Sequence, residues 1–338
     1  MIELLVVGAV ALLVIAAITA PLESLGWWAG WFGEDVNDGD PVHLFSQTAL
    51  QTDEAGKNYI VYLSGIGALT GSSIPKEELP FLDAVAEKMP GTVIIKDVFP
   101  YSVTNAGLTG ERVFSWVWRK IEAQRVINPN AASLYLIVIR NLFQVAVSAD
   151  QRYGPVYNVG VAKEIWRSLL RHGYRPGSDT PVTLMGTSGG GQVSAGVATY
   201  LAAMVNAPLR AISLGGVISA DPGLLKLDHL YHLYGTKDST QALGYKVFPG
   251  RWNWPFSQNS PWFRAERAGK ITMIELGPFT HTGADSPFDQ NSKLPDGQRH
   301  FDKTLEVVTE IVGTFYHVPP QPNQPVNGLQ HIGQKDQA

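Results

Sequence analysis

The stretch VTLMGTSGGGQVSAG, residues 182–196, places a serine between glycines, after an apolar run and before a helix-like run. Gly186 and Gly190 bracket Ser188 in the spacing GxSxG. A serine that attacks a carbonyl carbon must project from a sharp strand-to-helix turn, and small neighbours leave room for both the turn and the substrate. The N-terminus of the following helix would stabilise developing negative charge. The spacing therefore predicts a nucleophilic serine.

The same glycines also fit a plain strand-to-helix connection or a phosphate-binding loop. A P-loop needs a lysine after its last glycine, and position 192 is a glutamine. A nucleotide-binding α/β protein is therefore disfavoured, and the nucleophile turn is the preferred interpretation.

A nucleophilic serine requires a histidine as general base and an acid that orients it, in the chain order serine, acid, histidine. Asp238 ends the strand-like run HLYHLYGTKD, and His281 lies at the end of the next strand-like run, in ITMIELGPFTHTG. These two residues are the predicted acid and base. The alternatives are Asp221, in SADPG after the preceding strand, and His300, in GQRHFD.

The oxyanion formed in acyl transfer needs two backbone N–H donors beside the serine. Gly189, directly after the nucleophile, supplies the first predicted donor. The loop YLSGIGALTG follows the first strong strand, and there Gly65 allows close backbone approach, so the N–H of Ile66 is the second candidate. A glycine turn that only leaves the sheet is the alternative interpretation.

Six short apolar runs alternate with helical patterns along the chain. The runs cover 58–68, 92–100, 181–186, 209–219, 227–238 and 270–279, and helix-like patterns lie at 77–89, 160–174 and 191–205. Strands separated by helices predict a mostly parallel sheet with helices on both faces, with its site at the carboxyl ends of the strands.

The N-terminus is nearly continuous apolar sequence from Ile2 to Ala20, charged only at Glu3, close to the ~20 residues that cross a bilayer. Three tryptophans follow, at 27, 28 and 31, where an interfacial aromatic belt would lie. No Lys or Arg precedes the run and Pro21 follows it, so a retained membrane anchor is preferred over a cleaved signal peptide or a buried helix. The acidic stretch EDVNDGD weakly favours a non-cytoplasmic catalytic domain.

These patterns divide the chain into four parts. The predicted boundaries are an anchor with its aromatic interface at 1–32, a linker at 33–57, an α/β domain at 58–318 with a helical insertion at about 101–155, and a disordered Pro- and Gln-rich tail at 319–338. The insertion contains an amphipathic pattern at 111–125 and a long apolar run broken by Arg140 and Asn141, so it is interpreted as packing helices or a membrane-lying lid.

Composition narrows the function classes. The chain has 338 residues, a net charge of −4 and no cysteine. The absence of a basic excess argues against nucleic acid as a partner, and the missing cysteines exclude disulfides, thiolate nucleophiles and cysteine metal sites. No metal or cofactor is expected.

The motifs GTSGGG, YGTKD and GPFTHTG, in that order behind the strand YIVYLSGIG, resemble the α/β-hydrolases over roughly residues 58–316. The resemblance implies a sheet of about eight strands, a Ser–His–Asp triad, no cofactor, and hydrolysis of esters, thioesters or amides. The anchor, the insertion and the GGGQ run are also similar to uncharacterised membrane-anchored bacterial members. The chain departs from the family in having LSGIG where many members have His-Gly.

The expected function is a membrane-anchored serine hydrolase acting on a lipid or other acyl ester. The loop at 248–267 carries aromatic side chains suited to an acyl chain, namely Trp252, Trp254, Phe256, Trp262 and Phe263. A thioesterase or acyltransferase would use the same triad. The alternative from another class is a non-catalytic, membrane-tethered interaction scaffold.

Overall fold

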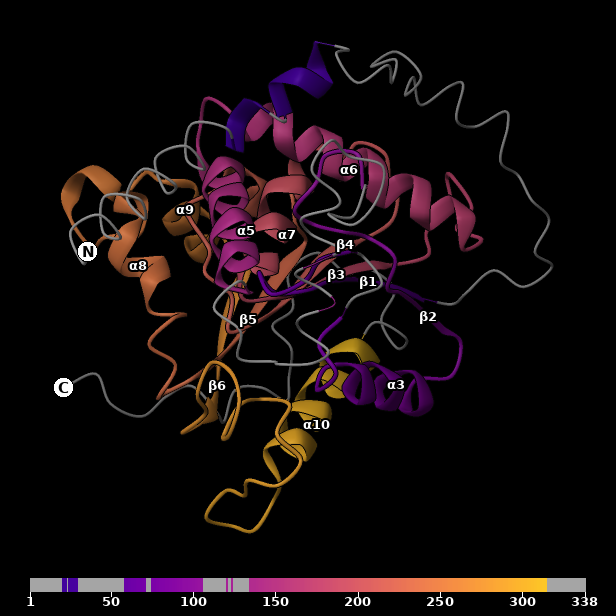
Figure 1. Cartoon of the computed structure of the whole chain (residues 1–338), viewed down its shortest axis with the longest axis vertical. Helices are drawn as coiled ribbons and strands as arrows, with labels where there is room; N and C mark the ends of the chain where they lie inside the picture. Colours follow the sequence, from indigo (N-terminus) through magenta and orange to yellow (C-terminus); the bar gives the residue numbers. More distant parts are fainter. Residues whose placement is uncertain are drawn as a thin grey trace.

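The computed structural model describes residues 20–22, 24–29, 58–70, 74–105, 120, 123 and 134–314. A six-stranded sheet forms its centre, in the order β2-β1-β3-β4-β5-β6, and every neighbouring pair runs parallel (Figure 1). The strands are β1 Asn58–Leu63, β2 Thr92–Ile95, β3 Val182–Thr187, β4 Leu209–Leu214, β5 His229–Gly235 and β6 Ile271–Gly277. The predicted parallel α/β sheet is confirmed.

The number of strands differs from the expectation. The described residues form six strands, not about eight. Each strand begins within one of the six apolar runs of the sequence, so the run pattern agrees with the sheet, and the larger number came only from the family resemblance. Among the described residues, no other β-rich run is present to extend either edge.

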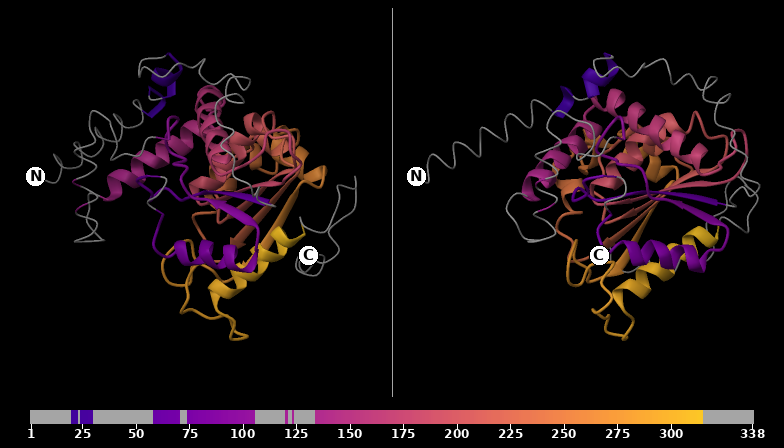
Figure 2. Two further views of the ribbon diagram at one scale, coloured as in Figure 1. Left: turned by 90° about the vertical axis from the view of Figure 1, so that its right-hand side faces the viewer. Right: turned by 45° about the vertical axis from the view of Figure 1, so that its right-hand side comes forward.

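Helices cover both faces of the sheet (Figures 1 and 2). They are α3 Leu79–Lys88, α5 Leu134–Ala149, α6 Gly154–Arg171, α7 Gly189–Leu201, α8 Leu243–Val247, α9 Pro261–Arg267 and α10 His300–Gly313, with short 3-10 turns η2 Pro222–Leu225, η3 Pro249–Arg251 and η4 Pro255–Ser257. α3 and α10 lie together on one face, and α6 and α7 lie on the other.

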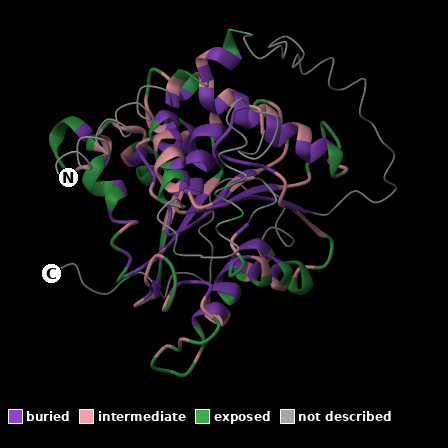
Figure 3. Cartoon of the chain, in the orientation of Figure 1, coloured by how far each residue is buried: buried purple, intermediate pink, exposed green. Residues whose placement is uncertain are grey.

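The two faces have separate apolar cores because strand side chains alternate. In β1, Tyr59, Val61 and Leu63 join the core under α6 and α7, whereas Ile60 and Tyr62 join the core under α3 and α10. Both sets are buried, which is why this strand is apolar throughout rather than alternating. The buried sheet and the exposed outer sides of α3 and α10 are visible in Figure 3.

The predicted insertion is described from residue 134 onward as α5, which packs against α7 and α6. Residues 106–119, 121–122 and 124–133 of that region lie outside the described residues. So do the predicted linker at 33–57 and the predicted tail at 319–338.

Only the end of the predicted anchor is described. Ala20 is buried, and its carbonyl accepts a hydrogen bond from Gln144 Nε2 at 3.3 Å, while residues 1–19 lie outside the described residues. Of the three predicted interfacial tryptophans, Trp27 packs into the core, Trp28 is exposed, and Trp31 is not among the described residues. In the described part of the chain, no helix has the length and apolarity needed to span a bilayer.

Candidate active site

Ser188 stands at the junction of β3 and α7 with a strained backbone. Its φ of 51° and ψ of −120° are rare for a residue with a side chain. Three backbone hydrogen bonds maintain this conformation: Ser188 N–H donates to Leu214 O, and Gly191 and Val217 N–H donate to Ser188 O, each at 3.1 Å. Such strain persists only where the surroundings enforce it, and it is common at functional sites.

The glycines around Ser188 let the strand and the helix cross closely. A Cβ on Gly186 would lie 2.5 Å from the carbonyl carbon of Gly190, and a Cβ on Gly190 would lie 2.1 Å from Leu63 O. Both distances are far inside van der Waals contact. Any larger residue would push α7 away from β3 and β1, so the GxSxG spacing is a packing requirement of this turn.

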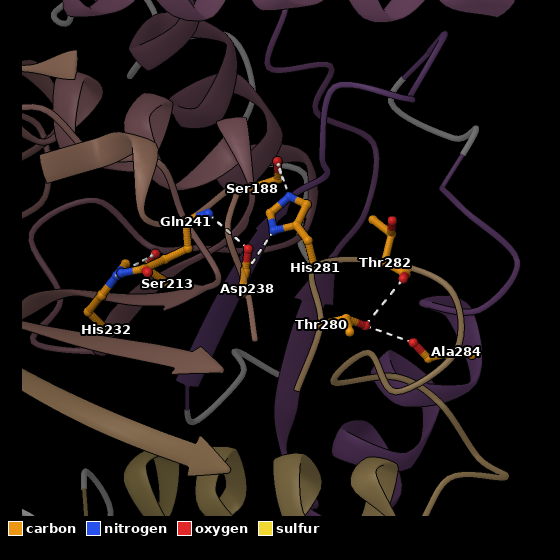
Figure 4. Close-up of polar contacts among 9 residues, drawn as sticks. All are labelled: Ser188, Ser213, His232, Asp238, Gln241, Thr280, His281, Thr282 and Ala284. Carbon is orange, nitrogen blue, oxygen red and sulfur yellow. Dashed lines mark hydrogen bonds and ion pairs between the residues drawn. The ribbon is translucent and has the colours of Figure 1, made fainter. Parts of the chain in front are cut away.

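His281 joins the serine to Asp238 (Figure 4). His281 Nε2 lies 2.9 Å from Ser188 Oγ, and His281 Nδ1 lies 2.8 Å from Asp238 Oδ2. The Asp238 side chain is 3% exposed and that of His281 is 17% exposed, so the acid is shielded while the imidazole edge stays reachable. An Nδ1–H donated to the carboxylate leaves Nε2 free to accept the serine proton.

A chain of buried polar groups positions the Asp238 carboxylate on the side away from His281. Gln241 N–H donates to Asp238 Oδ1 at 2.8 Å, and Gln241 Nε2 lies 2.9 Å from His232 Nε2. His232 Nδ1 lies 3.1 Å from Ser213 Oγ, and complete burial lowers the pKa of His232 to about 3. The neutral ring can therefore accept from Gln241 through Nε2 and donate to Ser213 through Nδ1.

The two alternative site residues lie elsewhere. Asp221 accepts from Gly223 N–H at 2.8 Å and from Gln192 Nε2 at 3.2 Å, which caps η2. His300 begins α10, stacks on Phe279 with a centroid distance of 4.0 Å, and has Nδ1 3.0 Å from Asp285 O. The structure brings Ser188, Asp238 and His281 together and leaves the two alternatives in packing roles.

The segments that carry the two predicted oxyanion donors lie next to the serine and to each other. A Cβ built on Gly65 would lie 3.4 Å from Ser188 Cβ, so this loop runs directly against the nucleophile. A Cβ built on Gly189 would lie 2.8 Å from the Ile66 side chain. Ile66 lies within a turn closed by a hydrogen bond from Ala68 N–H to Gly65 O at 3.2 Å.

Two residues that the sequence interpretation missed brace this oxyanion loop, residues 64–68. Asn141 Nδ2, on α5, donates to Ile66 O and Ala68 O, both at 2.8 Å. Tyr101 OH donates to Ser64 O at 2.7 Å, and a Cβ on Gly189 would lie 3.1 Å from the same hydroxyl. The one sequence signal was the polar pair Arg140 and Asn141, which breaks a long apolar run.

A buried carboxyl group lies behind the nucleophile. Tyr62 OH donates to Glu78 Oε2 at 2.6 Å and lies 3.2 Å from Thr187 Oγ1, next to the serine. Burial raises the pKa of Glu78 to about 7, although the hydrogen bond from Tyr62 opposes the shift. No motif in the sequence pointed to this group.

The aromatic loop at 248–267 does not gather around the serine as one wall. Trp262 is buried with the Arg251 guanidinium 3.5 Å from its ring centre, whereas Phe256 is 93% exposed. The start of the loop lines a cavity of about 540 Å³ that also contains Asp221 and whose lining does not include Ser188. In the described part of the chain, no three His, Asp or Glu side chains are arranged to hold a metal ion.

Comparisons with known proteins add little to this geometry. No family model matches the chain, and no curated protein matches it. Among solved structures, the chain is similar to the "putative cell surface hydrolase" from Lactobacillus plantarum WCFS1, with 10% identity over 78% of this chain and 93% of that one, at a TM-score of 0.33. At that TM-score the likeness assigns no activity. The mixed α/β fold with its parallel sheet is consistent with an α/β-hydrolase.

Proposed function

We propose that this protein is a serine hydrolase that cleaves a carboxylic ester through an acyl-enzyme intermediate. The observation that carries the proposal is the position of His281, within hydrogen-bond distance of Ser188 Oγ through Nε2 and of Asp238 through Nδ1. The three residues come from different loops at the carboxyl ends of β3, β5 and β6, where sites of parallel sheets lie.

In the proposed reaction, Ser188 Oγ attacks the ester carbonyl carbon while its proton moves to His281 Nε2. The N–H groups of Ile66 and Gly189 would stabilise the resulting oxyanion. Collapse breaks the bond to the leaving alcohol, which takes the proton from His281 and leaves an acyl-Ser188 ester. Water then repeats the sequence, with His281 as general base, and releases the acid. Asp238 holds the imidazole orientation and stabilises the imidazolium throughout.

Apolar side chains lie beside the serine, which favours an acyl ester as substrate. A small buried apolar cluster lies between the oxyanion loop, the chain after β2, and α5, and it consists of Ala68, Leu69, Phe99, Tyr101, Ile137 and Val145. Val145 reaches Gly189, because a Cβ built there would lie 2.7 Å from its Cγ2. With residues 2–20 as a membrane anchor and the catalytic domain on the non-cytoplasmic side, we favour a lipid or other acyl ester as substrate. Thioester cleavage or acyl transfer would use the same triad with another leaving group or acceptor.

The test is labelling of the full chain, in detergent, with a fluorophosphonate probe that reacts only with activated serines. We expect labelling of the wild type and none of Ser188→Ala, with both proteins giving the same circular dichroism spectrum. Equal labelling of both would place the reactive serine elsewhere. A folded wild type that takes no label would overturn the hydrolase proposal in favour of the interaction scaffold.

A further inference from the structure

The outer face of α5 is apolar although it is exposed. Tyr135 is 68% exposed, Leu142 52% and Leu136 43%, and Ala146 is exposed beside them. The helix contains one charged residue, Arg140, whose guanidinium turns inward to Tyr101 O and Asn141 Oδ1. A surface helix ordinarily presents charged or polar residues to water, so an exposed apolar face of this kind points to a contact with protein or lipid.

Two surface helices, α3 and α10, follow the ordinary pattern, whereas the short helix α8 also exposes Leu243, Tyr245 and Val247. The exposed side of α3 presents Asp83, Glu87 and Lys88, and the exposed side of α10 presents Glu306 and Glu310. These helices cover the opposite face of the sheet from α5 (Figure 2). The exposed apolar face of α5 therefore has no counterpart on the two helices that cover the opposite face of the sheet.

The N-terminal chain reaches the molecule at α5. Gln144, on the inward side of α5, donates to the carbonyl of Ala20, where the 19-residue apolar run 2–20 ends. The residues that follow are held against the protein as well, since Ser24 is buried and Trp27 packs into the core with Lys163 Nζ, on α6, 5.7 Å from its ring centre. A bilayer that holds residues 2–19 would therefore have its surface next to α5.

We propose that the outer face of α5, formed by Tyr135, Leu136, Leu142 and Ala146, rests on the lipid bilayer. A tyrosine and leucines without charge suit the boundary between headgroups and acyl chains. This proposal rests on the proposed anchoring of residues 2–20. Because Ala20 is attached to the same helix, that anchor would bring lipid, rather than a soluble partner protein, to this face.

Only α5 itself separates its apolar outer face from the surroundings of Ser188. The inward side of α5 holds the oxyanion loop through Asn141 and reaches Gly189 through Val145. If the proposed hydrolase function holds, acyl esters dissolved in the membrane would enter the site at the edge of α5, so the substrates would be membrane lipids rather than soluble esters.

The cysteine-free chain allows a clean test of the contact. A single Leu142→Cys variant of the full chain, labelled with an environment-sensitive fluorophore, is placed in phosphatidylcholine nanodiscs with and without doxyl groups on the lipid acyl chains. We expect a blue-shifted label that loses fluorescence to the doxyl lipids. Asp83→Cys on α3 and Met273→Cys on β6, both exposed positions, serve as matched controls and should show neither effect.

Two outcomes would overturn the proposal. A label at residue 142 that behaves like the one at residue 83 would mean that α5 faces water. A blue-shifted label that doxyl lipids do not quench would mean that protein, from this chain or a second copy, covers α5.

A second measurement separates the surface from the catalytic proposal. The double variant Leu136→Ser, Leu142→Ser should hydrolyse a phospholipid ester in vesicles about tenfold more slowly, with hydrolysis of soluble p-nitrophenyl butyrate unchanged. Equal rates for wild type and variant on vesicles would contradict membrane delivery. If doxyl lipids quench the label at residue 142 but the protein cleaves neither ester, the membrane contact of α5 is supported and the hydrolase proposal is contradicted.

Discussion

The two sides of Ser188 are held in place in different ways. On the acid–base side, Asp238 and His281 follow neighbouring strands, and Asp238 is fixed by Gln241, three residues along its own loop. On the oxyanion side, the loop 64–68 is fixed from a distance, by Tyr101 after β2 and by Asn141 on α5. The acid–base side depends on side-chain types, and the oxyanion side depends on the backbone path and on remote residues that hold it.

The difference matters because the two sides would fail differently. Loss of a triad side chain removes a chemical group from the reaction. Loss of Tyr101 or Asn141 leaves every catalytic group present but shifts the predicted oxyanion donor by fractions of an ångström. A displacement of that size weakens transition-state stabilisation without removing it. Four changes, ordered from the largest expected effect to the smallest, can break or sharpen this contrast.

Replacement of Asp238 by asparagine should break the acid–base side. The amide cannot stabilise the imidazolium and favours the wrong tautomer, so kcat on a soluble ester should fall about 10⁴-fold. The matched control is Asp221→Asn, a carboxyl group of similar burial in the preceding loop, which should keep kcat within a few-fold of wild type. Steady-state kinetics decide the point, and a larger loss in the control would mean that the acid has been misassigned.

The buried carboxyl group of Glu78, which lies behind the nucleophile, should make the stability of the protein depend on pH. Its pKa is raised from an ordinary 4.5 to about 7 by burial, so the folded protein binds more protons than the unfolded chain between those values. The stabilising contribution is therefore full below about pH 4.5 and is lost as the pH rises through 7. Relative to Glu78→Gln, the wild type should lose about 3 kcal/mol of unfolding free energy between pH 4.5 and 8.

Urea denaturation of both proteins across this pH range measures the Glu78 effect. A difference in unfolding free energy that stays constant with pH would show that the carboxyl group titrates normally in the folded protein.

Replacement of Asn141 by leucine should loosen the oxyanion side. The loop would lose two hydrogen bonds at Ile66 O and Ala68 O, so kcat and kcat/KM should fall together by about 10- to 100-fold, less than the loss of a donor itself. The control is Asn158→Leu, a buried amide on α6 that bonds Ser148 and does not touch the loop. A rise in KM alone, or the same loss in both variants, would argue against a positioning role.

Tyr101→Phe should give the smallest effect. It removes one hydrogen bond, to Ser64 O, and leaves the ring packed, so kcat should fall about threefold to tenfold. Tyr157→Phe is the counterpart, because that hydroxyl donates to Pro100 O rather than to the oxyanion loop. If both variants lose activity equally, the effect belongs to general packing.

Much of the fold and half of the site could be predicted from local patterns. The six strands match six apolar runs, since strands buried on both faces must be apolar throughout. Asp238 and His281 could be selected because a serine nucleophile requires these residue types after later strands. Asp221 and His300 met the same requirement, and the spacing alone did not separate them from the pair beside Ser188.

The remaining contacts join segments that lie far apart in the chain. Asn141 is 75 residues from Ile66, and Tyr101 is 37 residues from Ser64. The sequence around Asn141 or Tyr101 gives no sign that its side chain forms a hydrogen bond to the loop 64–68. The burial of Glu78 against Tyr62 likewise depends on how α3 packs beside β1, which no periodicity specifies.

By itself, the sequence determined the glycine corner and offered the residue types that the proposed acyl transfer needs, because small residues at a sharp turn follow from local sterics and the serine, acid, histidine order follows from the proposed reaction. Only the tertiary structure decided which acid and which histidine meet Ser188, what holds the oxyanion loop, and that the end of the N-terminal apolar run lies against α5. These outcomes depend on how helices pack on the sheet. Packing is set by the sum of many weak contacts across the chain and not by any one motif.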